Sequence, residues 1–308
     1  MTTNNKTRLD RQMDELLELE NAGKLETKLT NRGLRKFTSN KLAVLGLIML
    51  VIICVMCYGA PLFTSFEATA IDLSSILQAP NSTHIMGTDQ LGRDIWARML
   101  YGGRVSIAIG LGSAIGAAII GVSLGLIAGY KGGWLDRIVL KVSEIFSAFP
   151  QLMLVLIMVS ITTPSLKNIL FIFIITGWPG MYRMARSRVL SIKQEEYIES
   201  LQAFGINELI IGFKHILPNA IGPIFVNITL STSTFILQEA SLSFLGLGVP
   251  QELATWGNIL NVVNGRLDYI VQNWWLWVPC GIFLTLFVLS INFIGDGLRD
   301  ATDPTQMG

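Results

Sequence analysis

The sequence predicts an all-α, polytopic membrane protein with six transmembrane helices. Three observations support this prediction: 51% of the 308 residues are hydrophobic, only 15% are charged, and the hydrophobic residues come in long blocks. An ordinary soluble domain carries roughly 25% charged residues. A chain with so few charged side chains requires a solvent of low dielectric constant, and the interior of a lipid bilayer is such a solvent.

Four blocks of the sequence are long enough to cross a bilayer. A hydrocarbon core of about 30 Å needs about 20 helical residues. The blocks share the absence of any charged side chain, and they are residues 42–60, 105–130, 145–166 and 271–295. Each is therefore expected to form one transmembrane helix.

Two further blocks are less regular. Residues 168–182 are uncharged over only 15 positions, and a Gly-Trp-Pro-Gly sequence at 177–180 interrupts them. This block would also suit a buried helix, but the side chains of Lys167 and Arg183 at its ends can extend to the membrane surface. Residues 219–238 are uncharged and continue past Glu239. Counting both blocks gives six spans.

The distribution of Lys and Arg predicts the orientation, because cytoplasmic loops carry an excess of these residues. With a cytoplasmic N-terminus and six spans, 18 of the 23 Lys and Arg residues fall on cytoplasmic segments. Both termini are therefore expected in the cytoplasm. Trp274, Trp275 and Trp277 are then expected at the outer membrane interface, which suits their amphipathic rings.

These blocks divide the chain into five expected parts. They are a cytoplasmic N-terminal segment (1–40), a first transmembrane helix (41–60), an extracellular loop (61–103), a core of five transmembrane helices with a cytoplasmic loop at 183–218 (104–298), and a cytoplasmic tail (299–308). Within the first part, Leu9, Met13 and Leu16 follow helical spacing. They predict a short amphipathic helix that lies on the membrane, on a partner or in solvent.

Composition and motifs exclude several functions. The net charge of +1 does not favour nucleic-acid binding. No G-x-x-x-x-G-K-[ST] sequence occurs, so the chain is expected to have no ATP-binding loop of its own. Three cysteines and two histidines make neither a disulfide framework nor a metal site. Cys54 and Cys57 are expected to be buried thiols in the first span.

Residues 121–125 match the G-x-S-x-G pattern of a nucleophilic serine. That pattern needs a turn between a strand and a helix, with a histidine and an acid as partners. Here it lies inside an uninterrupted apolar block. Gly121, Gly125 and Gly129 recur every four residues, and such a stripe of small residues favours close packing against a neighbouring helix. An intramembrane enzyme, with no expected catalytic residues, is the remote alternative.

Glu239 is the ionisable residue that lies deepest within a predicted span. A charged group in hydrocarbon costs several kcal/mol unless it faces a partner or a wet cavity. Glu239 is therefore expected to face the helix bundle or a subunit interface. A functional group and a hydrogen-bonded packing residue are equally open interpretations.

Residues 183–218 form the longest predicted cytoplasmic loop between spans. Residues 195–205 indicate a helix that ends at a glycine cap, and residues 207–213 indicate a second short amphipathic helix. Pro218 suits the start of the next membrane helix, where a missing N–H costs nothing. Leu201, Phe204, Leu209 and Phe213 are expected to face the cytoplasm, which a simple connector would not need. The loop is therefore predicted to be a docking surface.

The sequence of this loop also resembles a loop that is typical of a known family. Glu199-Ser200-Leu201, Gly205 and Ile216-Leu217-Pro218 are similar to the E-A-A…G…I-x-L-P loop of ABC importer permeases, although Ser200 and Leu201 replace the two usual alanines. Residues 87–94 resemble a G-T-D-x-L-G-R-D segment, and residues 239–248 with Trp256-Gly257 resemble a second block. With residues 40–43, they identify the chain as a C-type subunit of the dipeptide, oligopeptide and nickel permeases from about residue 37 onward.

This resemblance implies a fold, partners and site residues. It implies the type I ABC importer fold in a bacterial inner or plasma membrane, a homologous B-type permease subunit, two ATPase subunits that bind ATP and Mg²⁺, and an extracellular substrate-binding protein. No cofactor on this chain is implied. The residues expected to couple to an ATPase are Glu199, Ser200, Leu201, Ala203, Phe204, Gly205, Leu209, Phe213, Leu217 and Pro218.

The resemblance leaves a short peptide or nickel as the substrate, and the residues favour a peptide. A borderline metal ion prefers imidazole or thiolate ligands along its route, whereas His84 and His215 lie in predicted loops on opposite sides. A peptide needs a wide cavity with scattered polar groups. The fifth span offers such groups at Asn227, Thr229, Ser231, Thr232, Ser233, Thr234 and Gln238.

Overall fold

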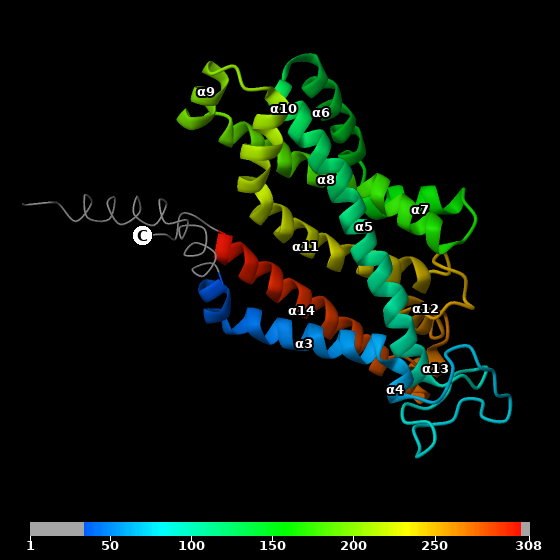
Figure 1. The fold of residues 1–308 in the computed structure, drawn as a ribbon. Helices are drawn as coiled ribbons and strands as arrows, with labels where there is room; N and C mark the ends of the chain where they lie inside the picture. Colours follow the sequence, from blue (N-terminus) through cyan, green and yellow to red (C-terminus); the bar gives the residue numbers. More distant parts are fainter. Residues whose placement is uncertain (1–33, 303–308) are drawn as a thin grey trace, which may run out of the picture.

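The computed structural model describes residues 34–302, and the amphipathic helix predicted near residues 9–20 lies outside this range. Within it the structure is built from helices, and the only β pairing is an isolated bridge between Thr88 and Asp94. The long helices lie side by side in one bundle. The loop of residues 64–94 lies at one end of the bundle, and α9 and α10 project from the other (Figure 1).

The long helices are α3 (Lys41–Tyr58), α5 (Ile95–Lys131), α6 (Gly133–Ser147), α8 (Leu166–Ile192), α11 (Leu217–Phe244) and α14 (Val278–Thr302). Shorter ones connect them: α4 (Ala60–Phe63), α7 (Gln151–Ser160), α9 (Glu196–Ala203), α10 (Glu208–Ile210), the π-helical η1 (Ile211–Ile216), α12 (Trp256–Asn261), α13 (Leu267–Gln272) and the 3₁₀-helical η2 (Trp274–Leu276).

Four described helical stretches are long and apolar enough to cross a membrane: Lys41–Tyr58, Ile95–Lys131, Ile211–Phe244 and Trp274–Thr302. The bent pair of α6 and α7 makes a fifth if it counts as one span. The fourth predicted span, residues 168–182, lies in α8, which is long enough to cross a membrane but is not among these apolar stretches. The C-terminal half of α8 contains Arg183, Arg186 and Arg188, and these side chains lower its hydropathy.

The third predicted span is not one straight helix. Residues 145–166 were expected to form it, but α6 ends at Ser147, α7 begins at Gln151, and the two helices meet at 83°. Pro150 explains the break, because proline lacks the N–H that a continuous helix needs and disfavours helical geometry at the preceding residue. The bend opens space beside α8 and α11.

Helix directions follow from the glycines that pack between helices. A Cβ on Gly116 would meet Ile174, one on Gly121 would meet Met181, and one on Gly125 would meet Ala185. Residue numbers rise together on both helices, so α8 runs parallel to α5. The contacts of Gly297 with Ala43 and of Gly46 with Ser290 show that α3 and α14 run antiparallel.

The glycine stripe of α5 therefore packs against a neighbouring helix, as predicted. A Cβ on Gly121 would lie 2.5 Å from the Cβ of Met181, and one on Gly125 would lie 2.7 Å from the Cβ of Ala185. Side chains at these positions would push α8 away from α5. Ser123, the serine of the G-x-S-x-G pattern, thus lies within a packing helix and not at a strand–helix turn.

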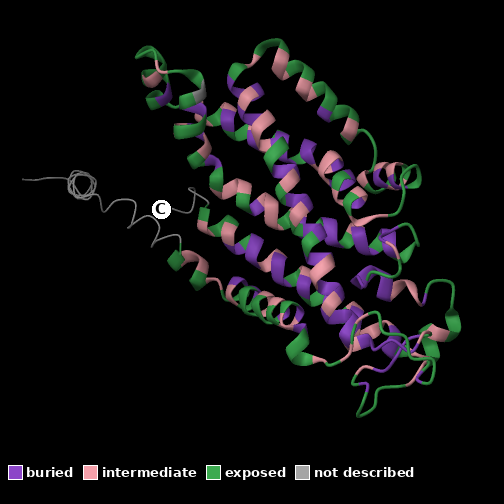
Figure 2. Ribbon diagram, turned by 45° about the vertical axis from the view of Figure 1, so that its right-hand side comes forward, coloured by how far each residue is buried: buried purple, intermediate pink, exposed green. Residues whose placement is uncertain are grey.

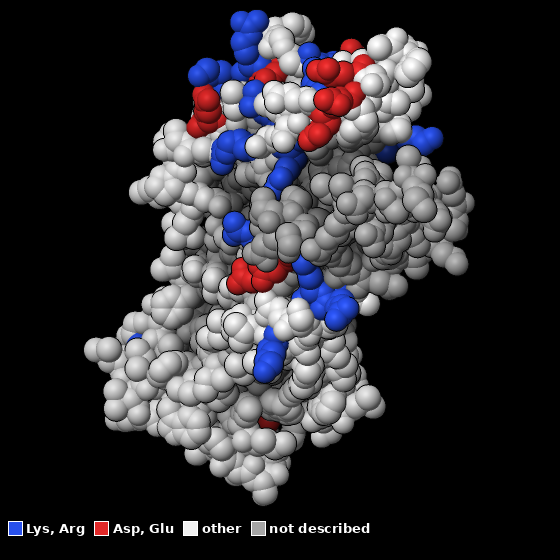
Figure 3. Space-filling view, turned by 90° about the vertical axis from the view of Figure 1, so that its left-hand side faces the viewer, with Lys and Arg blue, Asp and Glu red and all other residues white. Residues whose placement is uncertain are grey.

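The outer faces of the bundle are apolar. Buried residues line the inner faces of the helices, and exposed residues lie on the outside (Figure 2). On α3 the exposed residues are large and hydrophobic, including Leu45, Ile48, Val51, Ile52 and Val55. An apolar surface along a whole helix suits contact with lipid tails. Figure 3 shows Lys, Arg, Asp and Glu gathered at the end that carries α9 and α10, with a smaller group near the middle of this face and few at the opposite end.

Residues 87–94, which carry the G-T-D-x-L-G-R-D resemblance, form a buried polar network at the opposite end. Asp89 accepts hydrogen bonds from the backbone N–H groups of Leu91 and Arg93 and, at 2.7 Å, from Nε of Arg93. Asp94 caps α5 by accepting from the N–H of Ala97, and its other oxygen lies 2.9 Å from Nδ1 of His84. This cap starts α5 at Ile95, ten residues before the charge-free block.

The tryptophans near residue 275 do not share one environment. Trp274 is half exposed, whereas Trp275 is buried in a cluster that also contacts Leu77 and Met86 of the loop. Trp275 is therefore held by its packing against this loop and not by contact with the membrane interface.

In the same loop, hydrogen bonds from Ser74 and Ser75 hold the pKa of Asp72 below its ordinary value.

Candidate functional site

The loop between α8 and α11 contains the helix and glycine cap that the sequence predicted. α9 has Glu196 and Glu199 in its first turn, where negative charge suits the positive end of the helix dipole. At the other end the N–H of Gly205 donates to the carbonyl of Gln202, and that of Ile206 donates to the carbonyl of Leu201. This pair of bonds is a Schellman motif, and the φ of +72° at Gly205 is its left-handed residue.

A small hydrophobic cluster fixes the loop to the ends of α5 and α8. Ile198, Ile211 and Ile216 of the loop are fully buried against Leu126, Tyr130 and Val189. Lys193 adds a hydrogen bond of 2.7 Å from Nζ to the Tyr130 carbonyl, and Gln202 donates to the Tyr130 hydroxyl at 3.0 Å. The loop is thus attached to two long helices and is not a free connector.

The outer side of the loop exposes apolar side chains. Phe204 is 84% exposed and Phe213 is 50% exposed. The other exposed residues of the predicted coupling set are Glu199, Ser200, Ala203, Gly205 and Pro218, while Leu217 is half-buried. Leu201 was expected to face the cytoplasm, but it packs partly buried against the cluster of Ile198. The side chain of Leu209 lies outside the described part of the structure.

The second helix of the loop is not separate from the membrane helix. α10 continues into η1 and then into α11, so the chain stays helical from Glu208 to Phe244. His215 therefore lies in a π-helical segment and not in a loop. Pro218 stands in the first turn of α11, as predicted, but η1 runs directly into this turn, so Pro218 does not mark a free helix start.

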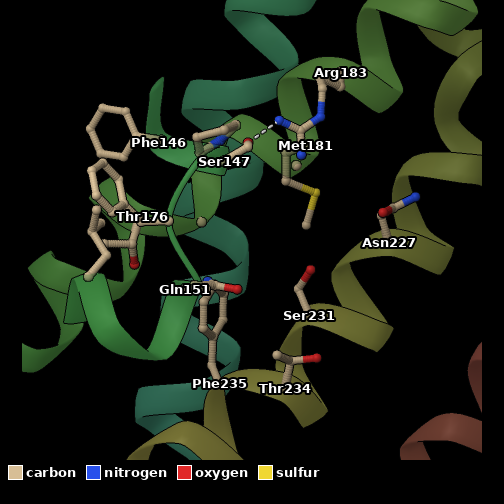
Figure 4. Close-up of a pocket in the computed structure, with 15 residues that line it drawn as sticks. Phe146, Ser147, Gln151, Thr176, Met181, Arg183, Asn227, Ser231, Thr234 and Phe235 are labelled. Atoms are coloured by element: carbon tan, nitrogen blue, oxygen red, sulfur yellow. Dashed lines mark hydrogen bonds between the residues drawn. The ribbon is translucent and has the colours of Figure 1, made fainter. Parts of the chain in front are cut away.

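A partly open cavity of about 350 Å³ lies beside the α6–α7 bend, between α8 and α11 (Figure 4). α11 contributes Asn227, Ser231 and Thr234, whose spacing puts them on one helix face. The lining residues are Phe146, Ser147, Phe149, Gln151, Leu154, Thr176, Gly177, Pro179, Gly180, Met181, Arg183, Asn227, Ser231, Thr234 and Phe235.

Three of the seven polar residues predicted along the fifth span line this cavity. Thr232 and Ser233 are buried in helix packing instead, and Ser233 donates to Asn292 of α14. Thr229 bonds to the carbonyl of Phe225, and Gln238 is not among the lining residues. The sequence analysis did not predict that Ser147 and Gln151 line the cavity. Pro150, which lies between them and breaks the helix, was the signal in the sequence that could have indicated it.

Arg183 also takes an unexpected position. It was expected to extend to the membrane surface, but its guanidinium Nη1 donates to the Ser147 hydroxyl at the end of α6, and its side chain lines the cavity. It is the one charged residue among those lining the cavity. Figure 4 shows it above Met181, across the cavity from Ser231 and Thr234.

Glu239 faces the inside of the bundle, as expected. Its side chain is fully buried. Oε1 accepts a hydrogen bond of 2.7 Å from Ser243, and Oε2 accepts one of 3.2 Å from Ser106, whose hydroxyl also accepts the N–H of Trp256. The carboxyl group therefore joins α5, α11 and α12. No group of three or more His, Cys, Asp or Glu residues suited to a metal ion occurs among residues 34–302.

A bundle of long apolar helices with hydrophobic outer faces defines the described chain as an integral membrane protein. The family model described as "Binding-protein-dependent transport system inner membrane component" matches residues 121–307. A second model, "N-terminal TM domain of oligopeptide transport permease C", matches residues 29–80.

Named relatives and solved structures agree with the two family models. The chain is 39% identical to the oligopeptide transport system permease protein OppC of Bacillus subtilis, over 93% of both chains. It is 41% identical to the dipeptide transport system permease protein DppC of Alkalihalophilus pseudofirmus, over 88% of both. A chain of the MetNI methionine ABC transporter superposes with a TM-score of 0.56 at 22% identity, covering 68% of this chain and 98% of that one.

The chain belongs to the family of binding-protein-dependent transport system inner membrane components. Its fold is that of a type I ABC importer permease, as the sequence resemblance implied. It is a multi-pass protein of the inner membrane. It acts with an ATPase and a substrate-binding protein and is not itself the enzyme of the transporter.

Proposed function

We propose that this chain is the C-type permease subunit of an ABC importer for short peptides. The peptide substrate is inferred from relatives that are oligopeptide and dipeptide permeases. The observation that best supports a role in coupling is the loop between α8 and α11, which exposes Phe204 and Phe213 while its other side is fixed to α5 and α8. Apolar groups exposed on a rigid element are typical of a protein docking site.

The assembled transporter contains this chain, a homologous B-type permease, two ATPases and an extracellular binding protein that delivers the peptide. Both termini and the α9–α10 loop lie in the cytoplasm, where the loop docks on one ATPase. ATP binding brings the ATPases together and moves the loop. Because Tyr130 holds both Lys193 and Gln202, the movement reaches α5. α5 packs along α8, which forms one wall of the cavity, so the movement is passed on to the cavity through α8.

The test replaces Phe204 with alanine in the complete transporter. Loss of an anchoring aromatic costs about 2 kcal/mol of docking free energy, which is roughly a 30-fold change in affinity. We expect ATP-driven peptide uptake into proteoliposomes to fall strongly while membrane insertion stays normal. Trp134→Ala is the matched control, because Trp134 is an exposed aromatic residue on α6 outside the loop.

Normal uptake with Phe204→Ala would contradict the coupling role. The substrate is identified by comparing peptide uptake and nickel accumulation in cells with and without the chain. Loss of labelled di- to oligopeptide uptake supports a peptide importer. Unchanged peptide uptake together with lost nickel accumulation would instead assign the chain to a nickel importer of the same family.

A further inference from the structure

Arg183 places a positive charge on the wall of a polar cavity. A guanidinium group carries five N–H donors, and the hydrogen bond to Ser147 occupies one nitrogen. The side chain is exposed and lines the cavity with Asn227, Ser231 and Thr234. None of the lining residues carries a negative charge. The guanidinium therefore has donors available for an anion that enters the cavity.

The acidic residues of the adjacent α6 are paired elsewhere. Asp136 accepts two hydrogen bonds of 2.6 Å from Arg186, and Tyr182 donates to the same carboxylate at 3.2 Å. Glu144 lies 2.8 Å from Nζ of Lys141. Arg186 is thus neutralised within the chain, and Arg183, three residues earlier on the same helix, is not.

The opposite wall offers groups for the rest of a peptide. The amide nitrogen of Asn227 donates to the carbonyl of Pro223, which leaves its oxygen as an acceptor for a peptide N–H. The hydroxyl of Ser231 is directed toward the cavity in Figure 4. These are neutral groups, so they add hydrogen bonds without selecting a particular side chain.

We propose that Arg183 binds the C-terminal carboxylate of the transported peptide. This inference rests on the proposed function, because it assumes a peptide substrate. Arg pairs with carboxylates through two parallel hydrogen bonds. The carboxylate is the negative group that all free peptides share, so one arginine serves peptides of any sequence. The remaining donors of Arg183 and the wall of Asn227 and Ser231 form this site.

The experiment compares a peptide that has a free C-terminus with the same peptide amidated at that end. Uptake is measured with the complete transporter, and each variant is expressed relative to wild type for each peptide. This ratio removes any preference of the binding protein. We expect Arg183→Gln to raise the half-saturating concentration of the free peptide roughly three- to tenfold, and to leave the amidated peptide unchanged.

Two further variants complete the test. Arg183→Lys keeps the charge but not the paired geometry and should restore part of the preference. Arg188→Gln, on the same helix but not lining the cavity, should behave as wild type. An equal loss for both peptides, or no loss for either, with Arg183→Gln overturns the inference and leaves the proposed function intact. A wild-type transporter that imports neither peptide overturns the proposed function and the inference with it.

Discussion

Glu239 combines full burial with hydrogen bonds to Ser106 and Ser243. If these bonds are its role, Glu239→Gln, which keeps the size and polar atoms, should be mild. Glu239→Leu leaves both hydroxyls without their partner, and an unpaired buried polar group costs about 1–3 kcal/mol. The thermal unfolding temperature of the purified chain in detergent should therefore fall more for leucine than for glutamine. Equal effects of the two changes would show that charge matters instead.

Gly205 is required for its backbone conformation and not for lack of space. Its φ is +72°, and a Cβ built there would meet nothing within 4 Å. The left-handed conformation costs an ordinary residue about 1–2 kcal/mol, and asparagine less. Gly205→Val should therefore reduce ATP-driven uptake several-fold without affecting membrane insertion, and Gly205→Asn should be nearly normal. Normal uptake with valine would show that the cap of α9 is not needed for coupling.

The directions of individual side chains were the feature that the sequence predicted least well. Glu239 and Gly205 were identified because an acid in an apolar block and a glycine after a helix are local signals. Arg183 and Leu201 were misplaced because their directions depend on distant residues. Arg183 lines the cavity because it donates a hydrogen bond to Ser147, which is 36 residues away in the sequence. Leu201 packs against the hydrophobic cluster that contains Tyr130.

The pairing of α5 with α8 depends on the glycine stripe. A Cβ on Gly121 would also lie 2.6 Å from the carbonyl oxygen of Trp178, so even alanine forces a backbone to move. Overpacking typically costs 1–3 kcal/mol. Gly121→Ala should lower the thermal stability of the purified chain, and Gly121→Leu should lower it further. Gly281→Ala on α14 is the control, because a Cβ there meets no neighbour. Equal stability of all three variants would contradict this packing.

At the scale of elements, the sequence predicted helices better than their breaks. The charge-free blocks correctly marked α3, α5, α11 and α14 because charge is excluded from helices in lipid. The α6–α7 bend lies inside such a block, where hydropathy has no contrast, and Pro150 alone marked it. The π-helical η1 left no comparable signal, since it depends on how Ile211 and Ile216 reach the cluster beneath the loop.

For the whole molecule, the number of membrane crossings can be argued from the two ends of the described chain. The side chain of Asn40, before α3, donates to Asp300 of α14 at 3.1 Å, so both ends lie on one side. Between them the number of crossings must be even. The composition-based count of four, or five with the bent pair, becomes six when α8 is included. α8 runs parallel to α5 and packs against residues 116–125 of it, so α8 crosses the same depth of the membrane as this part of α5.

Six crossings and the charge distribution predict which side each end faces. The residues at the α9–α10 end include Lys131, Arg137, Lys141, Lys193 and Lys214, and the positive-inside rule places this end in the cytoplasm. The loop of residues 64–94 then faces outward. A cysteine at Ser82, exposed in that loop, should react with an impermeant maleimide in intact cells, whereas one at Lys131 should react only after permeabilisation.

The native cysteines set the background of this measurement. Cys57 and Cys280 are buried and Cys54 is partly buried, so the unmodified chain should label weakly under both conditions. Labelling of Lys131→Cys, but not of Ser82→Cys, in intact cells would invert the topology. It would also move the α9–α10 loop to the outside, where no ATP-driven partner could reach it. The orientation experiment thus tests the coupling role independently of any transport assay.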